Sequence, residues 1–343
     1  MKKTALITVL AIAGLGITAV GFILNGNTES NVPGDKTVKD SESNHAFSHF
    51  NVLVVPDLSN RTDRGEKPKP LSDLVIINDI VDRINPDFIK NQNRRVEQKD
   101  RFQISFSNQS LISTHNIDQS KLQIRFDQFD KQLNRIEYIT GRADRTLDQD
   151  IASFKSEIKR TYEAVATSPK GADIWNYFNK LNELQVQMES LRPLKGPKGV
   201  LVDQEYKNVM ILLTDGYIEA AKFPKSKVCN SLSEGRVKKF RRAFQSEGNG
   251  RSVDQFFEEE GYGITPIDNP VLKNLNVIVL ELDDRSLNDD GNATVQPTDA
   301  EIIELFWSDW LTKSGVNEFE LHPTASSIDE VRQGLNRFMG IER

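Results

Sequence analysis

Oxygen-bearing side chains follow two short apolar runs that lie far apart in this chain of 343 residues. The first run, VLVVP, leads into Asp57 and Ser59, and the second run, VMILL, leads into Thr214, Asp215 and Gly216. In an open α/β sheet, ligands bind in the crevice outside the carboxyl ends of the strands. These side chains therefore stand where such a fold binds its ligands, provided that both runs are strands of one sheet.

The hydrophobic pattern predicts the elements that position these side chains. A short, continuous apolar run is typical of a strand buried on both faces, whereas apolar residues at helical spacing indicate amphipathic helices. Thr298 and Ser327 each open a Thr/Ser-x-x-Glu sequence, which predicts a capping box at the start of a helix. Strands are expected at 52–55, 102–106, 122–126, 209–213, 275–282 and 319–321, and helices at 74–84, 147–162, 174–184, 227–244 and after each capping box. This alternation predicts an α/β fold with a doubly wound, mostly parallel sheet flanked by helices on both faces.

Composition excludes several classes of function. The 37% hydrophobic and 27% charged content is that of a globular protein, and the formal charge of −6 argues against a general nucleic-acid binder. Cys229 is the one cysteine of the sequence, which excludes an intrachain disulfide and a multi-cysteine metal site. The acidic loop 283–299 lacks the ligand spacing of a calcium loop, so we expect it to be solvated.

The first residues predict an association with the membrane. Residues 4–24 are uncharged after Lys2 and Lys3, and at ~1.5 Å per residue they just span a bilayer core. Two interpretations stay open, an uncleaved anchor, which we favour, and a signal peptide cut after the triplet at 19–21. The lysines place the N-terminus in the cytoplasm and the rest outside it, for example in the periplasm, either membrane-anchored or exported and soluble.

These features together predict the domain organisation. Residues 1–24 are a signal anchor or signal peptide, and residues 25–48 form a polar linker. An α/β domain follows at 49–343, with insertions at about 108–170 and 217–270. We expect the first insertion to shape the surface for a partner.

The sequences at the two strand ends resemble motifs of one known family. DLSNR, at residues 57–61, resembles the DxSxS motif of von Willebrand factor A-type (VWA) domains, and LLTDG, at residues 212–216, resembles their later aspartate motif. The resemblance covers about residues 50–343 and implies a VWA fold, which is Rossmann-like. It also implies a metal-ion-dependent adhesion site, where loop hydroxyls and carboxylates hold a divalent cation that accepts a carboxylate of the partner. Mg²⁺ or Ca²⁺ suits such hard oxygen ligands.

Carried over onto this sequence, the resemblance makes Asp57, Ser59 and Asp215 the candidate metal ligands. Two positions depart from the family pattern. Arg61 replaces the second serine of the first motif, and Ala172 stands within the sequence GADI where the family usually has a threonine. An arginine stays protonated in proteins, so at short range it competes with a divalent cation.

Three outcomes are open for this site. A rearranged set using Asn60, Thr62 or Asp173 holds the metal, Arg61 replaces the metal by pairing with the two aspartates, or the crevice is a structural relic. We expect partner contacts from four residues of the site: Arg61, Asp173, Thr214 and Gly216.

The leading hypothesis is an extracytoplasmic binding module, not an enzyme, that recognises a protein partner at the carboxyl edge of the sheet for adhesion or assembly. One alternative is a metal-dependent phosphoester hydrolase, because a divalent cation between two carboxylates can activate water. No DxD pair, catalytic histidine or phosphate-cradling glycine loop accompanies those carboxylates. A further alternative is a metal-free scaffold of an envelope complex.

Overall fold

The computed structural model describes residues 47–58, 71–91, 97–167, 172–195, 201–219 and 226–341. These residues all belong to one structural unit, Asn44–Arg343. The predicted anchor or signal peptide and nearly all of the predicted linker lie outside the described ranges. Within those ranges, no helix has the length and apolar character that crossing a bilayer requires.

A six-stranded sheet forms the centre of the described chain, in the order β10-β9-β6-β1-β2-β3. Neighbouring strands are parallel, except that β3 runs antiparallel to β2. This confirms the predicted α/β class with a mostly parallel sheet, and each predicted strand is present. The first strand begins earlier than expected, inside the range predicted as linker. The strands are β1 (Phe47–Pro56), β2 (Arg101–Ile104), β3 (Gln123–Arg125), β6 (Gln204–Leu213), β9 (Leu275–Leu282) and β10 (Glu318–Pro323).

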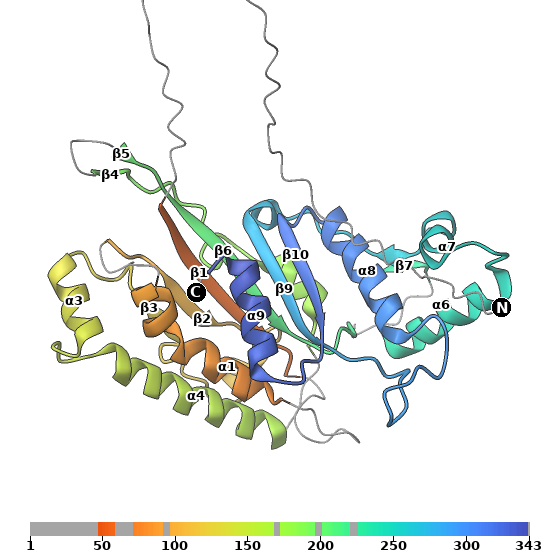
Figure 1. The fold of residues 1–343 in the computed structure, drawn as a ribbon, viewed down its shortest axis with the longest axis horizontal. Helices are drawn as coiled ribbons and strands as arrows, with labels where there is room; N and C mark the ends of the chain where they lie inside the picture. The colour runs from red at the N-terminus through yellow and green to blue at the C-terminus, as the bar shows by residue number, and fades with distance from the viewer. Residues whose placement is uncertain are drawn as a thin grey trace, which may run out of the picture. The chain divides into compact units, whose positions relative to one another are not determined.

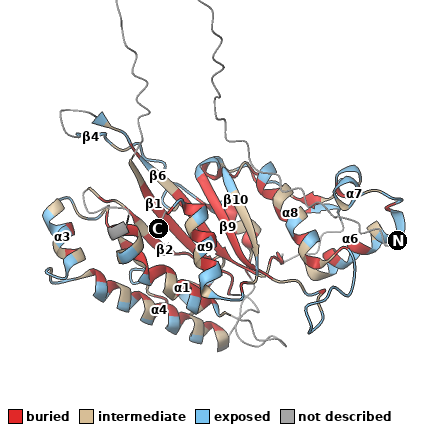
Figure 2. Cartoon of the chain, in the orientation of Figure 1, coloured by how far each residue is buried: buried red, intermediate tan, exposed pale blue. Residues whose placement is uncertain are grey.

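Helices cover both faces of this sheet (Figure 1). They are α1 (Asp73–Asp82), η1 (Ile84–Asn91), α2 (Ser110–Thr114), α3 (Gln132–Thr140), α4 (Leu147–Thr167), α5 (Ile174–Lys180), α6 (Glu234–Glu247), α7 (Val253–Glu259), η3 (Pro270–Asn274), α8 (Asp299–Lys313) and α9 (Ile328–Met339). In β1, Val52 and Val54 join a cluster with α1, α4 and α9, whereas Leu53 and Val55 join one with α5, α6, α7 and α8. The central strands are buried along most of their length (Figure 2), so their continuous apolar runs reflect helices on both sides.

Several helix ends differ from the sequence-based predictions. The helix predicted over 227–244 begins only at Glu234, because Val228 and Cys229 form the strand β7. The helix predicted to end before Pro86 is followed by η1, which contains that proline. The helix predicted over 174–184 ends at Lys180, so Leu184 lies beyond it and is 82% exposed. The capping box at Thr298 is complete, but at Ser327 only half of it forms, because the Glu330 carboxylate accepts from Ser326 instead.

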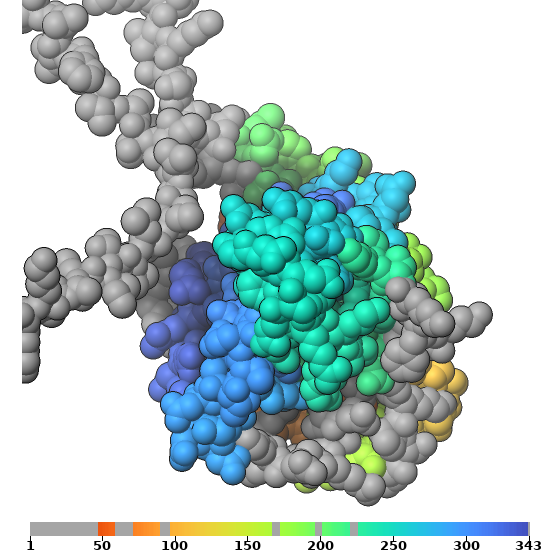
Figure 3. All heavy atoms as spheres, turned by 90° about the vertical axis from the view of Figure 1, so that its right-hand side faces the viewer, coloured from red at the N-terminus to blue at the C-terminus, as the bar shows by residue number. Residues whose placement is uncertain are grey.

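The two regions predicted as insertions both supply described elements that pack in the domain, and their status as insertions stays a prediction. Residues 108–170 supply β3 to the central sheet and place α4 beside α1, where Lys155 pairs with Asp82 at 2.7 Å. Residues 217–270 supply α6, α7 and a small sheet of β7 (Val228–Cys229) and β8 (Gly263–Ile264). The Phe240 and Phe257 rings lie 5.4 and 4.8 Å from that of Phe306 in α8. This region forms the teal surface in Figure 3, beside the blue loop and helix that follow β9.

An irregular segment, residues 182–192, crosses the middle of β1 and β6 on the face covered by α5, and we call it the strap. Asn51 of β1 donates its side-chain amide to the Gln185 carbonyl at 2.7 Å. Asn208 of β6 bonds the Gln187 backbone twice, accepting from its N–H at 2.7 Å and donating to its carbonyl at 3.0 Å. Two buried asparagines thus hold a stretch of polypeptide on the sheet by side-chain amides. The strap leads into a hairpin of β4 (Leu194–Lys195) and β5 (Leu201–Val202).

Candidate functional site

Asp57 and Thr214 meet where the strand order reverses, because the chain leaves β1 toward β2 on one side and β6 toward β9 on the other. Pro56 of β1 lies opposite Leu213 of β6, so the residues that follow are neighbours. The Asp57 N–H donates to the Leu213 carbonyl at 2.8 Å, and the Thr214 hydroxyl donates to Asp57 Oδ2 at 3.0 Å. Asp57 and Thr214 are only 2% and 0% exposed, so this hydrogen bond lies inside the protein.

Gly216 turns the chain beneath α8. Its φ of +87° is in the left-handed region, and an added Cβ would lie 2.7 Å from Ile303 and 2.8 Å from Leu282, so a side chain does not fit here. The Gly216 carbonyl accepts from the Trp307 indole at 2.8 Å. Gly216 and Thr214 are both buried, and their expected contact with a partner stays a prediction. In the described chain they shape the site from inside.

Asp215, the remaining residue of the second motif, is paired with an arginine from another loop. A terminal nitrogen of Arg285 lies 2.7 Å from Asp215 Oδ2, and the side chains are 40% and 15% exposed. The same guanidinium lies 3.4 Å from Glu234 and 3.5 Å from Asp283. It also stacks over the Tyr217 ring at 4.2 Å. We call Arg285 together with these four neighbours (Asp215, Tyr217, Glu234 and Asp283) the ion cluster.

The ion cluster keeps Arg285 charged. Burial alone would lower the pKa of Arg285, but the nearby Asp215 and the other acidic groups outweigh it, so this pKa lies above its ordinary value. One guanidinium faces three carboxylates, and Glu234 is also paired with Lys238. The cluster therefore retains excess negative charge and attracts a further cation.

A buried row of polar groups holds Tyr217 in place below Arg285. The Tyr217 hydroxyl donates to Asp299 Oδ2 at 2.5 Å, and Asp299 also forms a buried ion pair with Arg241. Arg241 donates in addition to the Pro297 carbonyl. Burial and the hydrogen bond to Asp299 raise the pKa of Tyr217 above its usual value, so the ring remains a neutral hydrogen-bond donor.

The described residues fit a divalent cation poorly. Asp57 Oδ2 accepts from Thr214, Asp215 Oδ2 accepts from Arg285, and Asp215 Oδ1 accepts from the Tyr217 N–H at 3.1 Å. In the part of the chain that the structure describes, no three Asp, Glu, His or Cys side chains are grouped closely enough to hold a metal ion. A cation ligated by Asp215 would therefore have to share that carboxylate with Arg285 or displace it.

The other predicted site residues fall into two groups. Ser59, Asn60, Arg61 and Thr62 lie outside the described residues, so the expected pairing of Arg61 with the two aspartates stays a prediction. Asp173 is the N-cap of α5, where its side chain accepts from the Asn176 N–H at 2.9 Å. It lines a separate polar cleft of about 520 Å³, and Ala172 beside it is buried.

Arg285 is the residue of this site that sequence reasoning missed. It lies in the acidic loop that was expected to be solvated, after the carboxyl end of β9. The signal that could have found it is a single basic residue directly after two aspartates, at the end of a strand next to β6 in a parallel sheet. The expectation for the loop is wrong at its start, where Asp283 joins the ion cluster and Asp284 accepts from Ser286.

Comparison with known proteins adds no relative. No family model matches this chain, and no curated protein matches it.

Proposed function

We propose that the protein is a binding module of VWA-like fold that recognises a protein partner at the carboxyl edge of its sheet. The observation that carries the proposal is the meeting of Asp57, Thr214 and Asp215 at the reversal of strand order, where open α/β sheets bind ligands. The order of the sheet supports its doubly wound character, because β1 lies inside and strands are added outward on both sides.

The ion cluster supports a partner that offers a positively charged side chain. It holds one exposed guanidinium among three carboxylates, so a carboxylate from a partner would be repelled and a basic side chain would be attracted. We propose that the partner offers a lysine or arginine to Asp215, Glu234 and Asp283. A Mg²⁺ or Ca²⁺ ion that displaces Arg285 is the alternative form of the same site.

The N-terminal sequence supports a location outside the cytoplasm. Lys2 and Lys3 precede the uncharged residues 4–24, and this arrangement retains the lysines in the cytoplasm. We propose that the binding domain works outside the cytoplasm on a membrane anchor, as part of an adhesive or envelope assembly.

In-cell crosslinking of the full-length chain tests this function. Wild type, Asp215→Asn and the control Asp329→Asn, whose side chain is 73% exposed, are treated with a membrane-impermeant crosslinker, purified and analysed by mass spectrometry. We expect one protein to be crosslinked to wild type and to the control. Its yield should fall about tenfold or more in Asp215→Asn, as loss of about 1.4 kcal/mol of binding free energy implies.

Two further measurements complete this test. Thermal unfolding of each variant must show that Asp215→Asn is folded, since asparagine keeps the shape and the acceptor for the Tyr217 N–H. Chelation of divalent ions separates the two forms of the site, because only the cation form loses the crosslink. An equal yield of the crosslinked protein from wild type and folded Asp215→Asn contradicts the proposed function.

A further inference from the structure

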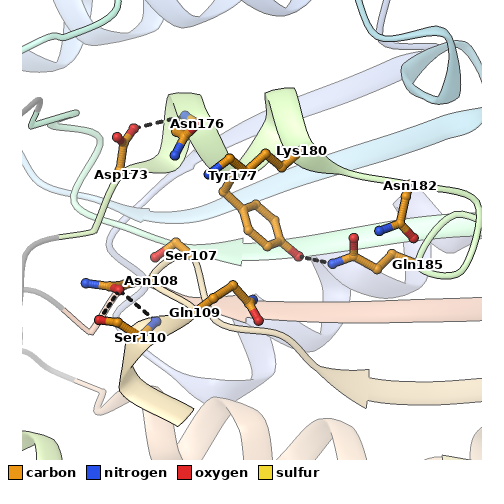
Figure 4. A pocket seen from close by; sticks show the side chains of 10 residues that line it. All are labelled: Ser107, Asn108, Gln109, Ser110, Asp173, Asn176, Tyr177, Lys180, Asn182 and Gln185. Atoms are coloured by element: carbon orange, nitrogen blue, oxygen red, sulfur yellow. Dashed lines mark hydrogen bonds between the residues drawn. The ribbon is translucent and has the colours of Figure 1, made fainter. Parts of the chain in front are cut away.

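A polar cleft opens between α5 and the loop that follows β2 (Figure 4). Its volume of about 520 Å³ is in the range of ligand-binding pockets. One wall is α5, with Asp173, Asn176 and Lys180, and the opposite wall is the loop 107–110. Gln185, which belongs to the strap, closes one end. None of its described lining residues belongs to the ion cluster, and apart from α5 its walls are mainly loops, one of them at the carboxyl end of β2.

We infer that this cleft binds an extended peptide segment, gripping the backbone through side-chain amides. The inference rests on the proposed function in one respect only, which is that the segment belongs to the protein partner. It adds a second contact to that function. This contact recognises the polypeptide backbone by hydrogen bonds, whereas the ion cluster recognises charge.

The lining offers both kinds of hydrogen-bonding group that a peptide needs. Gln109 donates its Nε2 to the Phe106 carbonyl at 2.7 Å, which turns its amide oxygen to serve as an acceptor. Asn182 uses its Oδ1 to accept from the Leu184 N–H at 2.9 Å, which leaves its Nδ2 as a donor. Each peptide unit carries one donor and one acceptor, so a strand lying between these groups can satisfy both.

The protein already holds polypeptide in this way a few residues further on. Asn208 bonds both the N–H and the carbonyl of Gln187, at 2.7 and 3.0 Å, and Asn51 bonds the Gln185 carbonyl at 2.7 Å. Gln185 belongs to this strap and also lines the cleft, where its amide lies 3.4 Å from the Tyr177 hydroxyl. A bound segment would thus continue the path of the strap and use the same amide chemistry.

The same lining is poorly suited to a saccharide or to an ion. Among the described lining residues, the aromatic ring is that of Tyr177, which is only 5% exposed, so it offers no open face for the apolar side of a sugar ring. The charged residues of this described lining, Asp173 and Lys180, have opposite signs and cancel. A neutral, hydrogen-bonding ligand of the peptide kind fits these groups best.

Selection from a phage-displayed library of random heptapeptides tests the inference on the purified full-length chain in detergent. The selected peptides are labelled, and their affinities are measured by fluorescence polarisation for wild type, Asn176→Ala and Gln109→Ala. Gln245→Ala, an exposed amide on α6, is the matched control. We expect enriched peptides whose affinity falls about fivefold or more in each cleft variant, as the loss of one hydrogen bond implies, and stays unchanged in the control. Neutral oligosaccharides (maltohexaose and chitohexaose) serve as the competing ligand class.

The outcomes separate this inference from the proposed function. Failure to enrich any peptide, equal affinity in wild type and the cleft variants, or oligosaccharide binding that the cleft variants abolish each overturns the inference. Peptide binding should persist in Asp215→Asn, because the two sites are separate. If Asp215→Asn loses the crosslinked partner but wild type binds no peptide, the inference fails alone. If wild type binds peptides in the cleft but Asp215→Asn keeps the crosslinked partner, the proposed function fails alone.

Discussion

Replacing Arg285 with glutamine should destabilise the folded protein by about 1.5–2 kcal/mol. The pair with Asp215 at 2.7 Å is partly exposed, so we assign it ~1 kcal/mol, the upper end for surface pairs. The stacking on the Tyr217 ring at 4.2 Å adds roughly 0.5–1 kcal/mol. The weaker contacts to Glu234 and Asp283 at 3.4 and 3.5 Å are not counted.

Urea unfolding of the full-length chain, followed by tryptophan fluorescence, measures this difference in the free energy of unfolding. Arg337→Gln is the control, because Arg337 also pairs with one carboxylate, at 2.9 Å from Glu320, but is 67% exposed. We expect the control to lose well under ~1 kcal/mol. Added sodium chloride should reduce the effect of Arg285→Gln, since salt screens its ionic part.

Divalent cations provide the sharper part of this test. Without Arg285, the carboxylates of Asp215, Glu234 and Asp283 lack their shared counter-charge, so Ca²⁺ should raise the unfolding midpoint of Arg285→Gln more than that of wild type. The reasoning is refuted when Arg285→Gln unfolds like the Arg337→Gln control and Ca²⁺ shifts both proteins equally. Arg285 would then be a surface residue without a role in the site.

Two further predictions address the interior of the site and the acid stability of the sheet. Thr214→Val removes the donor to Asp57 in a buried environment and should cost about 1–3 kcal/mol, whereas Thr214→Ser should restore most of the loss in the same urea assay. The pKa of Asp127 lies below its ordinary value, because its hydrogen bonds to the paired arginines of β2 and β3 outweigh the effect of its burial. Its contribution is therefore present above the unfolded pKa of about 3.9 and is lost as the pH falls through the folded pKa. The stability difference between wild type and Asp127→Asn should accordingly shrink on acidification below about pH 4, and a constant difference from pH 7 to pH 3 would contradict this.

The central sheet could be predicted because its central strands are short, continuous runs of apolar residues. Leu275–Leu282 was expected as a strand and forms β9 with the same bounds, since its continuous apolar run Val277–Leu280 is typical of a strand buried on both faces. Helix ends were harder to predict. Leu184 continues the helical spacing of α5, yet it lies in the strap, because periodicity does not show where a chain leaves a helix to bond to two asparagines.

The candidate site was predictable only where it depends on strands. Asp57 and Thr214 follow parallel strands in register, so their meeting could be inferred from two motifs. Its sequence position marks Arg285 as a candidate, but not its pairing with Asp215, because that pairing depends on a loop that the Asp283 N–H ties to the Asp215 carbonyl at 3.1 Å. The position of such a loop depends on contacts between distant residues. The polar cleft is a stronger case, since only its α5 wall has a periodic pattern and the loop and strap that complete it have none.

The pairing of β1 with β6 has a consequence for how the chain is made. Asn51 and Asn208, which bond to each other across these strands, are 157 positions apart in the sequence. At roughly 5–20 residues per second, a ribosome needs roughly 8–30 s to make the residues between them. During that interval one edge of β1 can pair with β2. The other edge, which later pairs with β6 and includes Val52–Val55, has no partner strand. Such an edge is prone to aggregation, so β1 stays open to wrong pairing until β6 is made.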